Sequence, residues 1–191
     1  MSSAAHKPRV EFQGERGAFS EEAALKLLGP WIELVPQRTF EMLFHTIERG
    51  EADYVLAPVG NTIAGPVHAS LDLLRRTSLV ALDEIEIQIE QRLIGCPDAT
   101  LTNIETVQSH PVALAQCKRF FAEHPRLKSI DADDTAGSVA EVIRRGDRTH
   151  AAIAGRRAAE YYGASIMRES IQDRPDNFTR FVLLGMKGKE S

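Results

Sequence analysis

The sequence of 191 residues contains only two cysteines and no long hydrophobic run. Cys96 and Cys117 lack the CxxC spacing and have no nearby ligand histidines, which argues against a disulfide framework and a structural zinc site. Buried free thiols are therefore expected. No apolar run approaches the ~20 residues of a membrane helix, and the N-terminus lacks the hydrophobic segment of a signal peptide. These absences predict a cytoplasmic protein without membrane contact.

An excess of basic residues is also missing. Lys and Arg number 23 against 27 Asp and Glu, a net charge of −4, which argues against nucleic acid as a partner because phosphate binding needs a basic face. The sequence contains no GxSxG motif for acyl transfer, no HExxH metal motif and no Walker A motif. The hydrophobic (43%) and charged (26%) fractions indicate a folded globular protein, either one large domain or two small lobes.

Strand-like and helix-like segments alternate along the first part of the chain. A continuous apolar run at residues 54–59 predicts a strand covered on both faces. Ser20 and Thr39 stand where side chains cap the first turn of a helix. The expected strands are residues 9–13, 32–36 and 54–59, and the expected helices are residues 20–28, 40–49 and 67–76.

The same alternation returns in the second part. Expected strands are residues 106–109, 127–131 and 151–154, and expected helices are residues 111–123, 134–145 and 156–162. Residues 82–95 alternate apolar and acidic side chains, which predicts one long, half-exposed strand. Residues 178–185 predict a final strand. This order of elements indicates an α/β fold with mostly parallel pairing and a ligand cleft at the carboxyl ends of its strands.

Four turns after the expected strands carry small, hydroxyl or amide side chains. They are residues 14–20, 60–65, 109–111 and 134–138. Each leads into a helix N-terminus, where unpaired N–H groups attract anions, although any one hydroxyl there is more often a simple cap. Together the turns suit a small ligand with carboxylate or phosphate groups.

Six segments, taken in order, carry a more specific signal. They read FQGERGAFSEEAA (12–24), YVLAPVGNTIAGPV (54–67), SHPVALAQC (109–117), DTAGSVAEV (134–142), AAIAGRRAAEYYG (151–163) and IQDRPDNFTRFVLL (171–184). The Asn-x-Thr-Arg-Phe element at residues 177–181 is the most specific of them. Together the segments resemble the catalytic domain of prephenate dehydratase, over residues 9–184.

The resemblance implies a fold and a reaction. The fold is α/β, with two lobes resembling the type II periplasmic-binding-protein fold and the active site in the cleft between them. We expect a first lobe of residues 9–84 plus 172–186, a second lobe of residues 85–171, and flexible tails at 1–8 and 187–191. The reaction is the decarboxylation and dehydration of prephenate to phenylpyruvate in phenylalanine biosynthesis, by a lyase that needs no cofactor and no metal. Prephenate is the expected small-molecule partner and a homodimer the expected assembly.

The resemblance also assigns the site residues. Thr179 is the expected catalytic residue, which donates a hydrogen bond to the leaving hydroxyl and relays a proton or stabilises developing charge. Arg180 is expected to clamp a carboxylate, with a structural ion pair as the alternative. The residues expected to bind substrate are Ser20, Asn61, Thr62, Ser109, Gln116, Thr135 and Arg180.

Two departures from the family pattern stand out. Gly60 occupies a position where the family carries Glu, so a carboxyl group near the expected chemistry is missing. We expect slower dehydration than in a Gly60→Glu variant, unless Gly60 is required for a backbone with positive φ. Most bacterial members also carry a C-terminal ACT domain that senses phenylalanine, and we expect none within the 191 residues given.

Two alternative functions stay open at this point. A relative that decarboxylates prephenate but keeps the hydroxyl, as in antibiotic pathways, is favoured by the missing acid and opposed by the intact Asn-x-Thr-Arg-Phe element. A non-catalytic protein that binds small carboxylates is possible because two-lobed clefts also serve as solute receptors. The retained Thr179 argues against this second alternative.

Overall fold

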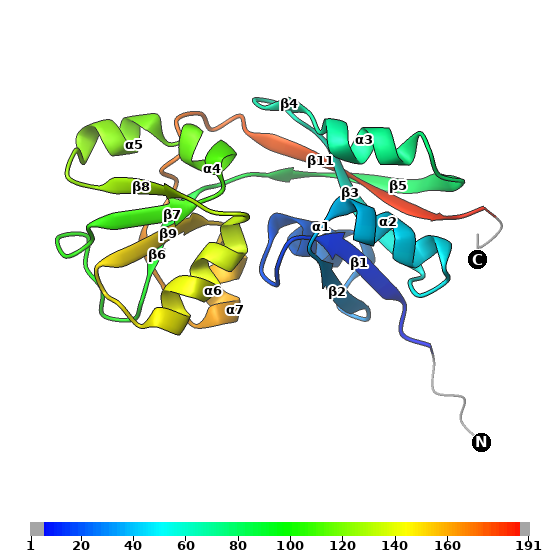
Figure 1. Ribbon diagram of the computed structural model, residues 1–191, viewed down its shortest axis with the longest axis horizontal. Coiled ribbons are helices and arrows are strands. Elements are labelled where there is room, and N and C mark those ends of the chain that lie inside the picture. Colours follow the sequence, from blue (N-terminus) through cyan, green and yellow to red (C-terminus); the bar gives the residue numbers. More distant parts are fainter. Residues whose placement is uncertain (1–5, 188–191) are drawn as a thin grey trace, which may run out of the picture.

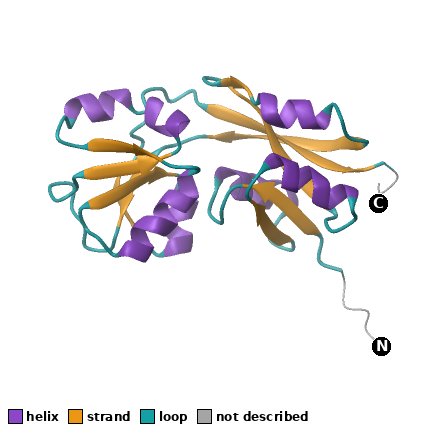
Figure 2. Ribbon diagram, viewed as in Figure 1, coloured by secondary structure: helices purple, strands orange, loops and turns teal. Residues whose placement is uncertain are grey.

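The chain forms two β-sheets with helices packed on both faces of each (Figure 1 and Figure 2), in a computed structural model that describes residues 6–187. Each sheet with its helices is called a lobe below. The chain leaves the first sheet after residue 88 and returns to it at residue 178. Most of the expected tails, 1–8 and 187–191, lies outside the described residues. No helix in the described part of the chain is long and apolar enough to cross a membrane.

The first lobe is built on a six-stranded sheet of order β2-β1-β3-β11-β5, with the short β4 paired to β3. Its elements are β1 (Arg9–Gln13), α1 (Phe19–Leu28), β2 (Glu33–Gln37), α2 (Phe40–Glu48), β3 (Tyr54–Asn61), β4 (Gly65–Pro66), α3 (His68–Leu74), β5 (Leu79–Gln88) and β11 (Phe178–Met186). Val10 and Leu56 pack with α1 on one face, and Val55 and Val182 pack with α2 and α3 on the other. Burial on both faces explains the continuous apolar runs of the central strands.

The second lobe is built on a five-stranded sheet of order β10-β6-β9-β7-β8. Its elements are β6 (Arg92–Gly95), β7 (Thr106–Ser109), α4 (Pro111–Ala115), α5 (Lys118–Glu123), β8 (Lys128–Asp131), α6 (Thr135–Arg145), β9 (His150–Ala154), α7 (Arg156–Tyr162) and β10 (Ser165–Arg168). Leu93 and Ile153 face α4 and α5, while Ile94 and Ala152 face α6 and α7.

The expectation of mostly parallel pairing is wrong. Strand β1 pairs parallel with β2 and β3, and β7 pairs parallel with β8 and β9, but every other pairing in the described sheets is antiparallel. The cause is the path of the chain. It leaves the first lobe along β5 and returns along the neighbouring β11, and two strands that lead out of and back into one sheet run in opposite directions.

Several expected boundaries also need correction. Residues 82–95 are two strands in different sheets, β5 and β6, and the expected lobe boundary after residue 84 falls inside β5, which stays paired to β11 as far as Gln88. The expected helix 111–123 is interrupted at Gln116, because the carboxylate of Asp173 accepts hydrogen bonds from the backbone of Lys118 and Arg119 and starts α5 anew. Thr39 caps α2 as expected, whereas α1 begins after Ala18 with no side-chain cap.

A buried ion pair connects the two lobes. Glu21 of α1 is fully buried and accepts hydrogen bonds from Arg16 (2.7 Å), from the backbone of Gly17 (3.0 Å) and from Arg157 of α7 (2.6 and 2.8 Å). Gly17 has a φ of 83°, and a Cβ there would lie 2.7 Å from the Cα of Ala158. Glycine therefore permits the close approach that brings Glu21 to Arg157.

Candidate active site between the lobes

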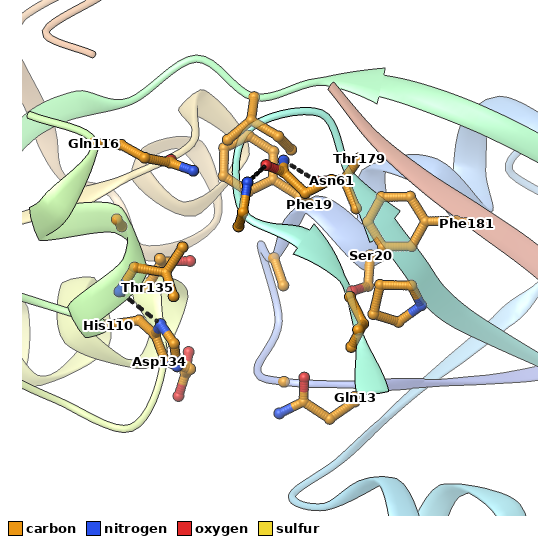
Figure 3. A pocket seen from close by; sticks show the side chains of 18 of the residues that line it. Gln13, Phe19, Ser20, Asn61, His110, Gln116, Asp134, Thr135, Thr179 and Phe181 are labelled. Carbon is orange, nitrogen blue, oxygen red and sulfur yellow. Dashed lines mark hydrogen bonds between the residues drawn. The ribbon is translucent and has the colours of Figure 1, made fainter. Parts of the chain in front are cut away.

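A cavity of about 480 Å³ lies between the two lobes (Figure 3). Its walls come from the end of β1, the start of α1, the β3–β4 turn and β11 in the first lobe. The second lobe contributes α4 and the start of α6, and the crossing segment contributes Ile89 and Gln91. Phe19 and Phe181 form part of an apolar wall, as expected for a cavity that accepts a small ring.

Five of the eight expected site residues line this cavity. They are Ser20, Asn61, Gln116, Thr135 and Thr179. Asn61 and Thr179 are cross-strand neighbours on β3 and β11, and the Nδ2 atom of Asn61 donates a hydrogen bond to Oγ1 of Thr179 at 2.9 Å. Gln116 and Thr135 approach from the opposite lobe (Figure 3). A ligand in the cavity therefore meets polar groups of both lobes.

The other three expected residues do not line the cavity. The hydroxyl of Thr62 accepts from the backbone of Phe178 and donates to the carbonyl of Asp176, which holds the returning chain against β3. Ser109 is fully buried, and its hydroxyl donates to the carbonyl of Ile153 at 2.6 Å. Both hydroxyls serve the packing of the fold.

Arg180 lies on the other face of its strand. Successive side chains in a strand point to opposite faces, so Thr179 and Arg180 cannot both face the cavity. Arg180 is exposed and forms an ion pair with Glu84 of β5 at 3.7 Å. This arrangement matches the alternative of a structural ion pair, and the carboxylate clamp stays a prediction.

Gly60 pairs with Arg180 across β3 and β11, so a side chain at this position lies on the Arg180 face. Its φ is outside the positive range, and a Cβ there would meet nothing closer than the carbonyl oxygen of Gly65 at 4.0 Å. The expectation that the backbone requires glycine here is wrong. A carboxyl group at this position would not face the same side as Thr179, and the effect of Gly60→Glu on dehydration stays a prediction.

The start of two helices brings backbone N–H groups to the cavity. α1 begins at Phe19, directly after Ala18 and without a side-chain cap, and both residues line the cavity. α6 begins at Thr135, and its cap is Asp134, whose carboxylate accepts from the backbone of Gly137 at 2.6 Å. The uncapped N-terminus of α1 leaves N–H groups and a positive dipole end for a ligand carboxylate.

Asp134 is the titratable residue of the cavity with a clear shift. Burial raises the pKa of its carboxyl group above the ordinary value, and the nearby Asp133 raises it further, against a lowering by hydrogen bonds from the backbone of α6. Within the described residues, no three His, Cys, Asp or Glu side chains are grouped closely enough to hold a metal ion.

The chain matches the family model of prephenate dehydratase over residues 10–189. The chain belongs to the prephenate dehydratase family. Among curated members of related sequence, arogenate dehydratase/prephenate dehydratase 1 of Arabidopsis thaliana is 39% identical over 178 residues, which are 93% of this chain and 45% of that protein. The bifunctional chorismate mutase/prephenate dehydratase of Neisseria gonorrhoeae is 36% identical over 177 residues, 92% of this chain and 49% of that protein. The chain thus spans about half the length of the curated relatives it matches.

Solved structures agree with the prephenate dehydratase fold. The prephenate dehydratase of Arthrobacter aurescens, solved with L-Phe, is 28% identical with a TM-score of 0.87, covering 94% of this chain and 61% of that chain. A protein described as GqqA, a quorum quenching acylase, is 30% identical with a TM-score of 0.83, covering 94% and 64%. A periplasmic substrate-binding protein from Coxiella burnetii is 14% identical with a TM-score of 0.51, covering 94% and 85%, and shows the fold alone. The expected two-lobed α/β fold is confirmed.

Sequence reasoning missed five polar residues that line this prephenate dehydratase cavity: Gln13, Gln91, His110, Asp133 and Asp134. His110 stands in a quoted segment, but its position before a proline favours a structural role, and its Nδ1 atom does accept from the backbone of Val112 at 3.2 Å. Gln91 lies in the crossing segment, where no turn or motif marks it. Its side chain is almost fully buried, and its Nε2 atom donates to Gln116 at 3.3 Å.

Proposed function

We propose that this protein converts prephenate to phenylpyruvate, carbon dioxide and water. The electron pair of the bond to the departing carboxylate moves into the ring, the ring C–O bond breaks, and the hydroxyl leaves as water after it gains a proton. Formation of the aromatic ring drives the step, so the protein must supply orientation, anion binding and a proton donor at the hydroxyl.

The observation that carries this proposal is the hydrogen bond from Asn61 to Thr179. Because the Oγ1 atom of Thr179 accepts from Nδ2 of Asn61, the hydroxyl hydrogen is left to point elsewhere, and no other described residue accepts it. Thr179 lines the cavity, so this hydrogen is available to the leaving hydroxyl of a bound ligand. An aliphatic hydroxyl is a weak acid, so we assign Thr179 the relay of a proton or the stabilisation of developing charge.

Other groups of the cavity fit the remaining tasks. The uncapped N-terminus of α1 and the side-chain amide of Gln116 are donors suited to carboxylate oxygens. Asp134 is a source for the proton, because burial raises its pKa and favours the protonated acid at higher pH than for an ordinary Asp. We take Asp134 rather than position 60 as the acid of this site.

A second candidate substrate is arogenate, in which an ammonium group replaces the keto group of prephenate. Two observations favour it. The cavity lining contains Asp133 and Asp134 but, among the described residues, no Lys or Arg. The Oε1 atom of Gln91, which also lines the cavity, is buried without a hydrogen-bond partner among the described residues, and so can accept from an N–H donor. An ammonium group complements both features.

The test is to supply prephenate and arogenate separately to the purified protein and to measure phenylpyruvate, phenylalanine and the product masses. We expect an aromatic product, with Thr179→Ala lowering kcat about 10²–10³-fold while KM changes little, since the interaction forms mainly in the transition state. Thr179→Ser is the matched control and should keep most of the activity. A Thr179→Ala variant with normal kcat would contradict the role of this hydroxyl.

The same experiment separates the other functions. A non-aromatic product that keeps its hydroxyl would identify a prephenate decarboxylase, and saturable binding without any product would identify a carboxylate-binding protein. Asp133→Asn should lower kcat/KM for arogenate more than for prephenate if the acidic wall contacts an ammonium group. An equal effect on both substrates would remove the argument for arogenate.

We also propose a cytoplasmic location and a homodimeric assembly, without a nucleic acid partner. The net charge of −4 supports the last of these, because phosphate binding needs a basic face. Size-exclusion chromatography with light scattering tests the assembly, and a monomer at micromolar concentration would contradict it.

A further inference from the structure

A chain of hydrogen bonds between side chains crosses from the first lobe to the second beside the cavity. It starts at Asn61, whose Oδ1 atom accepts hydrogen bonds from the backbone of Ile63 at 2.9 Å and of Ala64 at 2.8 Å. Because a backbone N–H can only donate, the oxygen of the Asn61 amide must lie on that side. Its Nδ2 atom therefore points in the opposite direction, as a donor.

This orientation determines the direction of the next two hydrogen bonds. Nδ2 of Asn61 donates to Oγ1 of Thr179 at 2.9 Å and to Oδ1 of Asn177 at 2.8 Å. The hydroxyl of Thr179 is thereby left as a donor. Asn177 is fully buried, and with its oxygen occupied by Asn61, its own Nδ2 atom faces the second lobe.

The hydrogen bonds to the second lobe have the same donor-to-acceptor direction. Nδ2 of Asn177 donates to Oε1 of Gln116 at 3.0 Å, and Nε2 of Gln91 donates to the same oxygen at 3.3 Å. With its oxygen taken by two donors, the Gln116 amide turns its Nε2 atom toward the cavity (Figure 3), where it has no hydrogen-bond partner among the described residues.

We propose that Asn177 is a positioning residue that holds the Gln116 amide with its N–H₂ group toward the substrate. The proposal rests on the proposed function, because it assigns Asn177 a role in binding the substrate of that site. The backbone N–H groups of Ile63 and Ala64 in the first lobe determine which atom donates in every hydrogen bond of this side-chain series. Asn177 connects the series to Gln116 in the second lobe. A ligand then meets two donors, one from each lobe, at Thr179 and Gln116.

The two donors match the acceptors of the proposed substrate. The leaving hydroxyl oxygen can accept from Thr179, and a carboxylate oxygen can accept from Gln116. Without Asn177, the Gln116 oxygen keeps only the longer hydrogen bond from Gln91, so the amide can more readily turn its carbonyl oxygen toward the ligand, where it repels a carboxylate. Loss of Asn177 should therefore weaken substrate binding through Gln116, which distinguishes positioning from a general loss of stability.

A double-mutant cycle tests this inference. We expect Asn177→Ala to raise KM about 10-fold, as for a lost hydrogen bond to a charged group. In a Gln116→Ala background, Asn177→Ala should raise KM by less than about twofold, because no amide is left to orient. Effects on KM that multiply in the double variant would overturn the proposal.

Asn177→Asp is a second variant of the same size, for use if Asn177→Ala does not fold. The protonated carboxyl group introduced at position 177 donates to Gln116 and keeps the direction of the chain, whereas the ionised carboxylate has no hydrogen to donate. We expect the kcat/KM of this variant, divided by that of the wild type, to fall as pH rises from 6 to about 10, because burial raises a carboxyl pKa into this range. Dividing by the wild type removes the titration of Asp134, His110 and Asp173. A constant ratio would overturn the proposal.

A measurement without substrate keeps this test separate from the proposed function. The NMR order parameter of the Gln116 side-chain amide should fall clearly in Asn177→Ala and stay unchanged in Gly60→Ala, which lies on the other face of β3. An unchanged order parameter in Asn177→Ala would overturn the inference even if the protein proved inactive on prephenate and arogenate. Inactivity of the wild type alone would contradict only the proposed function.

Discussion

Introducing the glutamate that the family resemblance implies for position 60 should not accelerate this protein. The residue pairs with Arg180 across β3 and β11, and Thr179 and Asn61 form the neighbouring pair on the opposite face. A carboxyl group acting as general acid inside the cavity would be worth about 10²–10⁴-fold in rate. A carboxyl group on the Arg180 face points away from Thr179, so we expect kcat of Gly60→Glu to stay within about twofold of the wild type.

The effect should instead be on stability. Glycine inside a strand costs about 0.5–1 kcal/mol relative to alanine, and the open space at Gly60 accepts a Cβ without strain, so Gly60→Ala should gain roughly that amount. The glutamate adds a cross-strand ion pair with Arg180, worth about 0.2–1 kcal/mol, in competition with Glu84. For a chain of this length, about 1 kcal/mol corresponds to a rise in Tm of about 2–4 °C.

The assay compares wild type, Gly60→Ala and Gly60→Glu in thermal unfolding and in turnover of prephenate. Both variants should have a higher Tm and unchanged kcat, and the difference between them should shrink in high salt, which screens the ion pair with Arg180. The reasoning is refuted if Gly60→Glu raises kcat tenfold or more while Gly60→Ala does not. That result would mean that the side chain at position 60 reaches the substrate.

Three further predictions follow from buried groups. Glu21→Gln should destabilise the protein by about 1–3 kcal/mol at pH 7, as measured by urea unfolding, because it weakens the bonds to Arg16 and Arg157. Burial by itself raises the pKa of Glu21, but hydrogen bonds from Arg16, Gly17 and Arg157 outweigh it and lower the pKa below 4.5. The stability difference between wild type and Glu21→Gln should therefore be full above pH 4.5 and vanish as pH falls through the lowered pKa. A stability difference that persists at pH 2 would contradict the assignment. Ser109→Ala should cost about 1 kcal/mol of stability and leave KM unchanged, and a raised KM in the folded variant would return Ser109 to the substrate site. Cys117 should not react with a thiol reagent at pH 8 in the folded protein, since burial raises its pKa to about 12, and rapid labelling would show that α5 opens.

Local patterns were sufficient to predict most of the elements. Strands β1 and β7 and helix α7 begin and end at the expected residues, because apolar periodicity and turn residues lie within each segment. The break between α4 and α5 could not be predicted in this way. It depends on Asp173, which comes from the other end of the second lobe and binds the backbone of α5.

The site was predictable where the chain order itself brings residues to the ends of strands. Asn61 and Thr179 were expected in the site and meet on neighbouring strands. Arg180 could have been recognised as doubtful from the sequence, since two adjacent residues of a strand do not share a face. The burial of Ser109 could not, because its partner, the carbonyl of Ile153, belongs to a strand whose register the sequence does not specify.

The position of β11 between β3 and β5 has a consequence for the order of folding during synthesis. The first sheet lacks an interior strand until residues 178–186 have emerged, although five of its strands are made before residue 89. The second sheet uses only strands within residues 92–168, so it has all of its strands while the first still has a gap. The lobe that is begun second can therefore be completed first, and the N-terminal strands must wait with unpaired edges, which exposes them to aggregation and to capture by chaperones.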